Sequence, residues 1–241
     1  MVVLISAIAM VSCSTKTSTE LTTAITTITD KSDSLQVYPS SKTFDQLVGK
    51  NIWKGQRFRF VDIGNTSMVT PHEFSIEPST RSDTPKKIRV QQFNQLKTGV
   101  NDYVESQEFQ TISGFNRSII FEKLTSELEL LHKTEADQKA LFLYTDMLEF
   151  DRYSFYDPAT FARLESDQPN LTKALLPLNQ TDYSDITIYW IYRCNTYQEN
   201  QRYRVIRDFL QKSFASYSIT FIPRASTPTS LELTPNQLVS E

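Results

Sequence analysis

The chain has few of the residues on which many enzymes and nucleic-acid-binding proteins depend. Two histidines and two cysteines among 241 residues leave little for a Cys/His zinc site, which needs three or four ligands, and the same scarcity weakens Ser-His-Asp or Cys-His catalysis. Five glycines argue against a collagen-like or repeat protein. With a formal net charge of -3 the chain has no basic footprint, so we expect no nucleic-acid partner.

The composition is that of a globular domain with tails. Hydrophobic residues make up 39% of the chain and aromatic residues alone 12%. A chain of 241 residues is long enough to bury the core of one domain of ordinary to large size. We therefore expect a single folded domain.

The first residues are apolar and give way abruptly to serine and threonine. Residues 1–12 have the length of a signal-peptide core and are too short to span a bilayer as a helix. Met10-Val11-Ser12-Cys13 resembles the lipobox of bacterial lipoproteins, in a serine-cysteine-serine context similar to that of the Bacteroidota. This resemblance implies a lipid on Cys13 and a membrane-anchored, extracytoplasmic protein on the periplasmic side.

Serine and threonine dominate the segment that follows Cys13. A chain of this composition buries too little apolar surface to become ordered, so we predict a flexible tether over residues 13–45. The folded domain is then expected over residues 46–223, with a loose tail over residues 224–241. Lipidation of Cys13 would leave Cys194 unpaired within the chain, which favours a buried structural thiol.

Strand and helix patterns alternate along the predicted domain. The run from Ala140 to Tyr144 is apolar without alternation, as in a strand covered on both faces, and the run from Ile186 to Tyr192 is similar. Helical spacing of apolar residues characterises residues 93–104, 120–131 and 205–214. This order predicts an α/β domain with an open, mostly parallel sheet and helices on both faces.

Three loops of this predicted fold would bring oxygen-bearing side chains to one edge of the sheet. They are Asp62, Gly64 and Thr66 after a strand that begins near Trp53, Asn116 and Ser118 before a helix, and Thr145 and Asp146 after the central strand. Carboxylate, hydroxyl and water oxygens are the ligands that Mg²⁺ prefers, usually with one or two carboxylates. The sequence therefore predicts a magnesium site at this edge.

The order and spacing of the three loops resemble those of the von Willebrand factor A domain, over about Trp53 to Pro223. The resemblance implies a metal-ion-dependent adhesion site, where a partner protein's carboxylate completes the coordination of the ion. We therefore expect a protein-binding module and not an enzyme. The implied metal ligands are Asp62, Thr66, Ser118 and Asp146, with Gly64, Asn116 and Thr145 in support.

Two positions depart from the pattern of that family. Gly64 replaces a serine that would be a direct ligand, and Met147 stands where the family usually has glycine. A structural lipoprotein without an ion therefore stays open as an alternative. In such a protein Asp62 and Asp146 would accept hydrogen bonds from backbone N–H groups of neighbouring loops.

Two enzyme readings remain as further alternatives. The segment Asp62-Ile63-Gly64-Asn65-Thr66 also resembles the first phosphate loop of the actin and sugar-kinase ATPases, but no second such loop is found near Asp146. A phosphatase of the haloacid-dehalogenase type would use Asp62 as its nucleophile and Thr145 to bind phosphate. It would also need an acidic residue in place of Gly64 as the general acid.

Aromatic residues gather immediately after Asp146, between Phe150 and Tyr156. Tyrosine and arginine are favoured at the centres of protein interfaces, so this segment could contact a partner beside the predicted site. The alternative that we favour is a loop whose rings fold back onto the helices.

Overall fold

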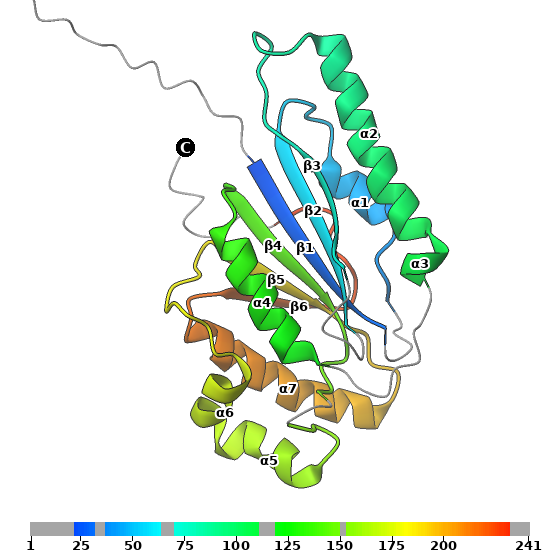
Figure 1. Ribbon diagram of the computed structural model, residues 1–241. Coiled ribbons are helices and arrows are strands. Elements are labelled where there is room, and N and C mark those ends of the chain that lie inside the picture. The colour runs from blue at the N-terminus through cyan, green and yellow to red at the C-terminus, as the bar shows by residue number, and fades with distance from the viewer. Residues whose placement is uncertain (1–21, 32–36, 64–69, 111–118, 150–152, 232–241) are drawn as a thin grey trace, which may run out of the picture.

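The computed structural model describes residues 22–31, 37–63, 70–110, 119–149 and 153–231 (Figure 1). These residues form a six-stranded sheet in the order β3-β2-β1-β4-β5-β6. Neighbouring strands run parallel except for β2 and β3, which are antiparallel. In chain order the strands are β1 (Thr22–Asp30), β2 (Gly55–Ile63), β3 (His72–Ile76), β4 (Gln138–Tyr144), β5 (Ile186–Ile191) and β6 (Thr220–Arg224).

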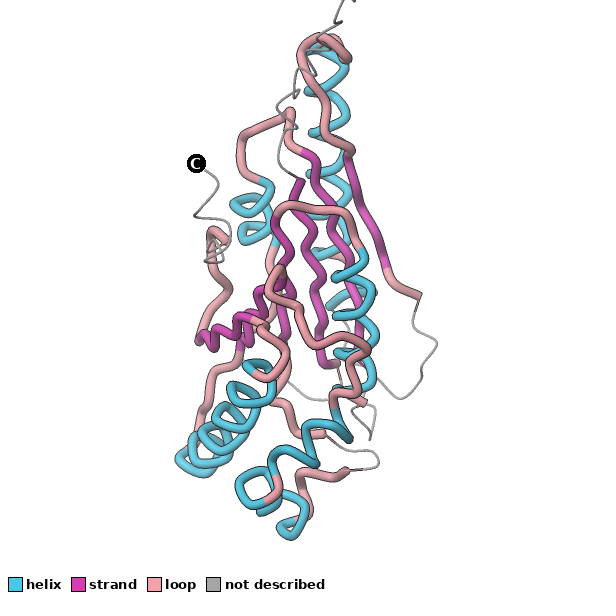
Figure 2. The backbone as a smooth tube through the Cα atoms, turned by 90° about the vertical axis from the view of Figure 1, so that its left-hand side faces the viewer, coloured by secondary structure: helices cyan, strands magenta, loops and turns pink. Residues whose placement is uncertain are grey.

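Helices cover both faces of the sheet, as the two views in Figures 1 and 2 show. One face packs against α1 (Ser41–Val48), α2 (Lys86–Glu105) and α3 (Gln107–Gln110). The other packs against α4 (Ile120–Lys133), α5 (Pro158–Ser166), α6 (Gln168–Leu175) and α7 (Tyr197–Ala215). The predicted α/β architecture, with an open and mostly parallel sheet and helices on both faces, is confirmed. None of the described helices is both long and apolar enough to cross a membrane.

The strand β1 lies in the middle of the sheet, so the prediction of a flexible tether over residues 13–45 is wrong for Thr22–Asp30. This strand pairs with β2 on one side and with β4 on the other, and Ala24, Ile25 and Ile28 are buried. Threonine is polar, but its β-branched side chain fits the pleated surface of a strand, and here it is interleaved with alanine and isoleucine. The folded domain therefore includes residues well before 46.

The tail predicted from residue 224 is also partly in contact with the domain. Arg224 is the last residue of β6, and the Tyr144 and Thr227 hydroxyls lie 2.6 Å apart in a hydrogen bond. Leu231 packs against the core on the face of the sheet that α2 covers. Residues 1–12 and 232–241, together with Cys13, lie outside the described residues.

The strands β4 and β5 supply the centre of the core. Every residue of β5 is buried, as are the last five of β4, which agrees with strands covered on both faces. Cys194, four residues after Trp190, is only partly buried, although a buried thiol was predicted. Burial still raises the pKa of the Cys194 thiol, with a further contribution from the nearby Glu199 carboxylate.

Candidate functional site

The order of the strands marks one position in the sheet where a ligand site is expected. The strands β1 and β4 are neighbours in the sheet. The strand that follows β1, β2, lies on the outer side of β1, and the strand that follows β4, β5, lies on the opposite side, beyond β4. Open α/β sheets bind ligands outside the carboxyl ends of the strands at such a switch point. Thr29 of β1 pairs with Tyr144 of β4, so the residues that follow them come first at this edge. They are Asp30 and Thr145, and Asp146 comes next.

Asp30 and Thr145 are linked by a buried hydrogen bond. The hydroxyl group of Thr145 donates to Oδ2 of Asp30 at 3.0 Å and accepts a bond from the backbone N–H of Met147 at 2.9 Å. The indole Nε1 of Trp190 donates to the carbonyl oxygen of Thr145 at 2.8 Å. Because both Asp30 and Thr145 are buried, these bonds fix the orientation of the Asp30 carboxylate.

Asp146 lies in a tight turn at the same edge and is partly exposed. Its Oδ1 accepts a hydrogen bond from the backbone N–H of Leu148 at 2.9 Å, a local arrangement common for aspartate in turns. Met147 has a φ of 61°, in the left-handed region that favours glycine, while its side chain is fully buried. The turn therefore presents Asp146 next to Thr145.

A third carboxylate connects this turn to the beginning of α4. The buried Glu149 accepts backbone N–H bonds from Ile120 and Phe121 through its Oε2, at 2.9 and 3.0 Å. The residue before α4, Ile119, makes no side-chain cap of its own. A carboxylate at this position satisfies two N–H groups and is favoured by the helix dipole. Glu149 thus holds the segment after Asp146 against α4.

Asp62 lies one strand away from this group, and its role as a metal ligand beside Asp146 stays a prediction. It lies on β2, so that β1 separates it from β4. Oδ2 of Asp62 is 2.6 Å from Nζ of Lys31, which also donates to the carbonyl oxygen of Glu108 at 2.9 Å. Burial raises the pKa of Asp62 more than the Lys31 ammonium lowers it. An ammonium group therefore lies beside one oxygen of Asp62, while the buried Oδ1 makes no hydrogen bond with the described residues.

The remaining predicted residues cannot be placed. Gly64, Thr66, Asn116 and Ser118 lie outside the described residues, so the prediction that they contribute to a site stays a prediction. The aromatic segment can be placed in part. Phe155 is buried and its ring meets that of Phe121 edge to face at 5.7 Å, so it folds back onto a helix, whereas Tyr156 is exposed.

Sequence reasoning missed Asp30, although the signal was present. The segment Asp30-Lys31-Ser32-Asp33-Ser34 follows the pattern Asp-x-Ser-x-Ser, the first motif of the family that the sequence resembles. The threonine-rich run before it has the composition of a tether as well as of a strand, and this ambiguity hides the strand end at Asp30. Ser32, Asp33 and Ser34 lie outside the described residues.

The oxygen atoms at this edge suit a hard divalent cation. The candidate ligands are the carboxylates of Asp30 and Asp146, and the Thr145 hydroxyl holds Asp30 in place. Water would supply the rest of a magnesium shell. Among the described residues, no cluster of three or more His, Cys, Asp or Glu side chains could hold a metal. A magnesium site needs only one or two carboxylates, so the residues present fit the ion.

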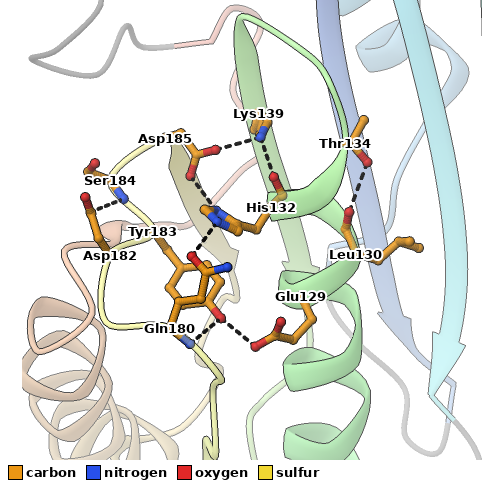
Figure 3. A network of polar contacts seen from close by, with 10 residues as sticks. All are labelled: Glu129, Leu130, His132, Thr134, Lys139, Gln180, Asp182, Tyr183, Ser184 and Asp185. Carbon is orange, nitrogen blue, oxygen red and sulfur yellow. Dashed lines mark hydrogen bonds and ion pairs between the residues drawn. The ribbon is translucent and has the colours of Figure 1, made fainter.

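A second polar network lies at the opposite, amino edge of the sheet (Figure 3). His132 places Nδ1 3.2 Å from Asp185 and Nε2 3.0 Å from the side-chain oxygen of Gln180. Asp185 also accepts a bond from Lys139 at 2.6 Å, and Tyr183 donates to Glu129 at 2.5 Å. Neither partner of the His132 ring is a serine, threonine or cysteine that a histidine base would activate. The network therefore fastens the end of α4 to the segment before β5.

Comparison with known proteins adds no family to this geometry. No protein-family model matches the chain, and no curated protein matches it either. The candidate site therefore depends on the strand order, the contacts of Asp30 and Thr145, and the motif in the sequence.

Proposed function

We propose that this chain is a protein-binding module that holds a divalent cation, Mg²⁺ or Mn²⁺, at the carboxyl edge of β1 and β4. The hydrogen bond from Thr145 to Asp30, beside Asp146 and at the switch point of the sheet, carries this proposal. Asp30 and Asp146 supply the negative charge, directly or through bound water, and Thr145 orients Asp30. This donor set has the number of carboxylates that magnesium sites use.

The resemblance to the von Willebrand factor A domain supports the same proposal once its first motif is moved from Asp62 to Asp30. The segment Asp30-Lys31-Ser32-Asp33-Ser34 keeps both serines, whereas the Asp62 segment has Gly64 in place of one. The departure at Met147 also carries less weight, because its φ of 61° is a backbone conformation that glycine adopts readily. Ser118 remains the hydroxyl expected from the middle loop.

The role of the cation in this proposal is to bind a partner protein. A magnesium ion held by few protein ligands keeps several positions for water, and a carboxylate of the partner can replace one of these waters. The proposal includes the lipid on Cys13, which would hold the domain at a membrane on its extracytoplasmic side. Acyl chains, and no described helix, would then provide the attachment.

Calorimetric titration with Mg²⁺ and Mn²⁺ tests the proposal on the full chain carrying Cys13→Ser. We expect saturable binding, weakened by more than about tenfold, or about 1.4 kcal/mol, in Asp146→Ala because half of the acidic charge is lost. Asp208→Asn, which removes a largely exposed carboxylate on α7, is the matched control and should bind as the parent does. Equal binding by Asp146→Ala and the parent would contradict the proposal.

A scaffold without an ion is the second candidate, and one observation favours it. Lys31 already places an ammonium group beside Asp62, close to the same edge of the sheet, and so supplies a positive charge from within the chain. A well-folded chain that binds neither cation in the titration would support this candidate over the first.

A further inference from the structure

The strand β3 ends the described sheet on the side of β2. It pairs with β2 from Phe60 opposite His72 to Gln56 opposite Ile76, and the sheet continues no further beyond it among the described residues. In an antiparallel pair every second residue turns its N–H and C=O groups away from the partner strand. The outer side of β3 therefore offers a row of backbone donors and acceptors to another strand.

A groove of about 660 Å³ runs along this edge, between β3 and α2. It touches Glu73 to Ile76 of β3 and the three residues that follow, and on α2 it touches Arg89, Gln92, Gln95 and Leu96. Successive residues of a strand point to opposite faces of a sheet, so only a groove that follows the strand's edge meets all of them. The hollow is therefore positioned where an added strand would lie.

The helix wall of this groove is held firmly in place. Gly99 lets α2 approach β3 closely, because a Cβ atom there would lie 3.0 Å from the ring of Phe74. At the other end of α2, the buried Arg89 donates to the carbonyl oxygens of Ile52, Trp53 and Lys54 at 2.5, 3.3 and 3.1 Å. A groove whose walls are fixed before binding does not need to be ordered by the ligand.

The charges along the groove select the kind of strand that fits. Glu73 on β3 and Glu77, one residue beyond its end, are both exposed. Glu73 meets Arg59 in an ion pair, and Glu77 makes no ion pair with another described residue. The positive charge of Arg89 is directed at backbone carbonyl groups. On the face toward α2 the groove offers the half-buried Phe74 and Ile76, with the exposed amides of Gln92 and Gln95 on the helix. A matching strand has basic residues on one face and apolar residues on the other.

We propose that the groove between β3 and α2 binds an extended segment of a partner protein as an additional strand, in which lysine or arginine alternates with small apolar residues. Opposite charges across neighbouring strands are stabilising, and like charges are unfavourable. A second copy of this chain fits less well, because pairing β3 with β3 would bring Glu73 and Glu77 of both copies to one ladder. This surface is separate from the Asp30 and Asp146 edge and does not depend on the proposed cation.

Fluorescence anisotropy with a labelled short peptide in which lysine and valine alternate tests this proposal on the full chain. We expect saturable binding to the parent chain, weakened more than about tenfold by Glu77→Lys, while Glu165→Lys, the same charge change on α5, has little effect. A peptide with the same side chains but N-methylated at alternate residues should also bind more than about tenfold more weakly, because it cannot donate backbone hydrogen bonds.

Three results would overturn the proposal. Absence of saturable binding would show that the edge is closed to an added strand. Equal binding of the N-methylated and unmodified peptides would mean that charge alone attracts the peptide, without strand addition. A dimer in light scattering that Glu77→Lys alters would assign the edge to a second copy of the chain.

Discussion

The two ends of the parallel strands carry polar networks of different kinds. At the amino edge, Asp185 meets the charged Lys139 and the ring of His132, and the contacts join two segments of the fold (Figure 3). At the carboxyl edge, Asp30 accepts a bond from a neutral hydroxyl and Asp146 from a backbone N–H. The contacts at the amino edge thus join two segments of the fold. Those of Asp30 and Asp146 orient two carboxylates side by side, which is the arrangement that the proposed cation site requires.

The largest effect is expected from deleting β1, the strand that contributes residues to both edges of the sheet. A chain that begins at residue 35 lacks β1, which carries Asp30 at one end. At the other end the backbone N–H of Thr22 donates to Oδ2 of Asp137, and the carbonyl oxygen of Thr22 accepts from the Asp137 N–H. Without its central strand the sheet loses the pairing partner of both β2 and β4. We expect no cooperative unfolding transition by circular dichroism. A folded truncated chain would show that β1 is dispensable, and the chain that begins at residue 14 is the control.

A pair of isosteric changes separates the roles of the two edges. Asp185→Asn leaves the nearly buried Lys139 ammonium without its carboxylate, so we expect a loss of about 1–3 kcal/mol in unfolding free energy and unchanged Mg²⁺ binding. Asp30→Asn keeps an acceptor for Thr145 and should do the reverse, weakening Mg²⁺ binding with a smaller loss of stability. Urea unfolding and calorimetry measure the two effects. The comparison fails if both variants change the same property.

The smallest expected effect concerns acid sensitivity at the amino edge. Burial raises the pKa of Glu129, but hydrogen bonds from Asn179 and Tyr183 outweigh it and hold that pKa below the ordinary value of 4.5. The charged carboxylate therefore contributes stability above pH 4.5, and this contribution disappears as pH falls through the folded-state pKa.

The variant Glu129→Gln should therefore be less stable than the parent by about 1 kcal/mol at pH 7, with the difference shrinking below about pH 4.5. Unfolding free energies measured by urea titration at several pH values give both curves. A difference that stays constant between pH 7 and pH 3 would show that the carboxylate's charge is not responsible.

The sequence was informative where the apolar pattern was strong. The runs ending at Tyr144 and Tyr192 predicted the central strands because only buried strands tolerate such continuous apolar character. The pattern failed at β1, where threonine serves equally in tethers and in strands. Asp146 was recognised because it follows one of these runs. Asp30 was missed because its strand was missed.

Contacts between residues that are far apart in the chain could not be predicted from the sequence, for a different reason. Nothing in the order of residues indicates that Lys31 would pair with Asp62, or that Glu149 would cap a helix that begins 29 residues earlier in the chain. Such contacts depend on which strands lie side by side. They could be predicted only after β1 had been placed between β2 and β4.

The early start of β1 has a geometric consequence for a lipid-anchored chain. Only nine residue steps separate Cys13 from Thr22, and a fully extended chain of that length reaches about 30 Å. Thr22 is at the amino edge, and the nine residues of β1 extend about 30 Å from there to Asp30. A linker this short would keep the amino edge of the sheet near the lipid headgroups. The carboxyl edge would then face away from the membrane, toward a partner that approaches from the surrounding space.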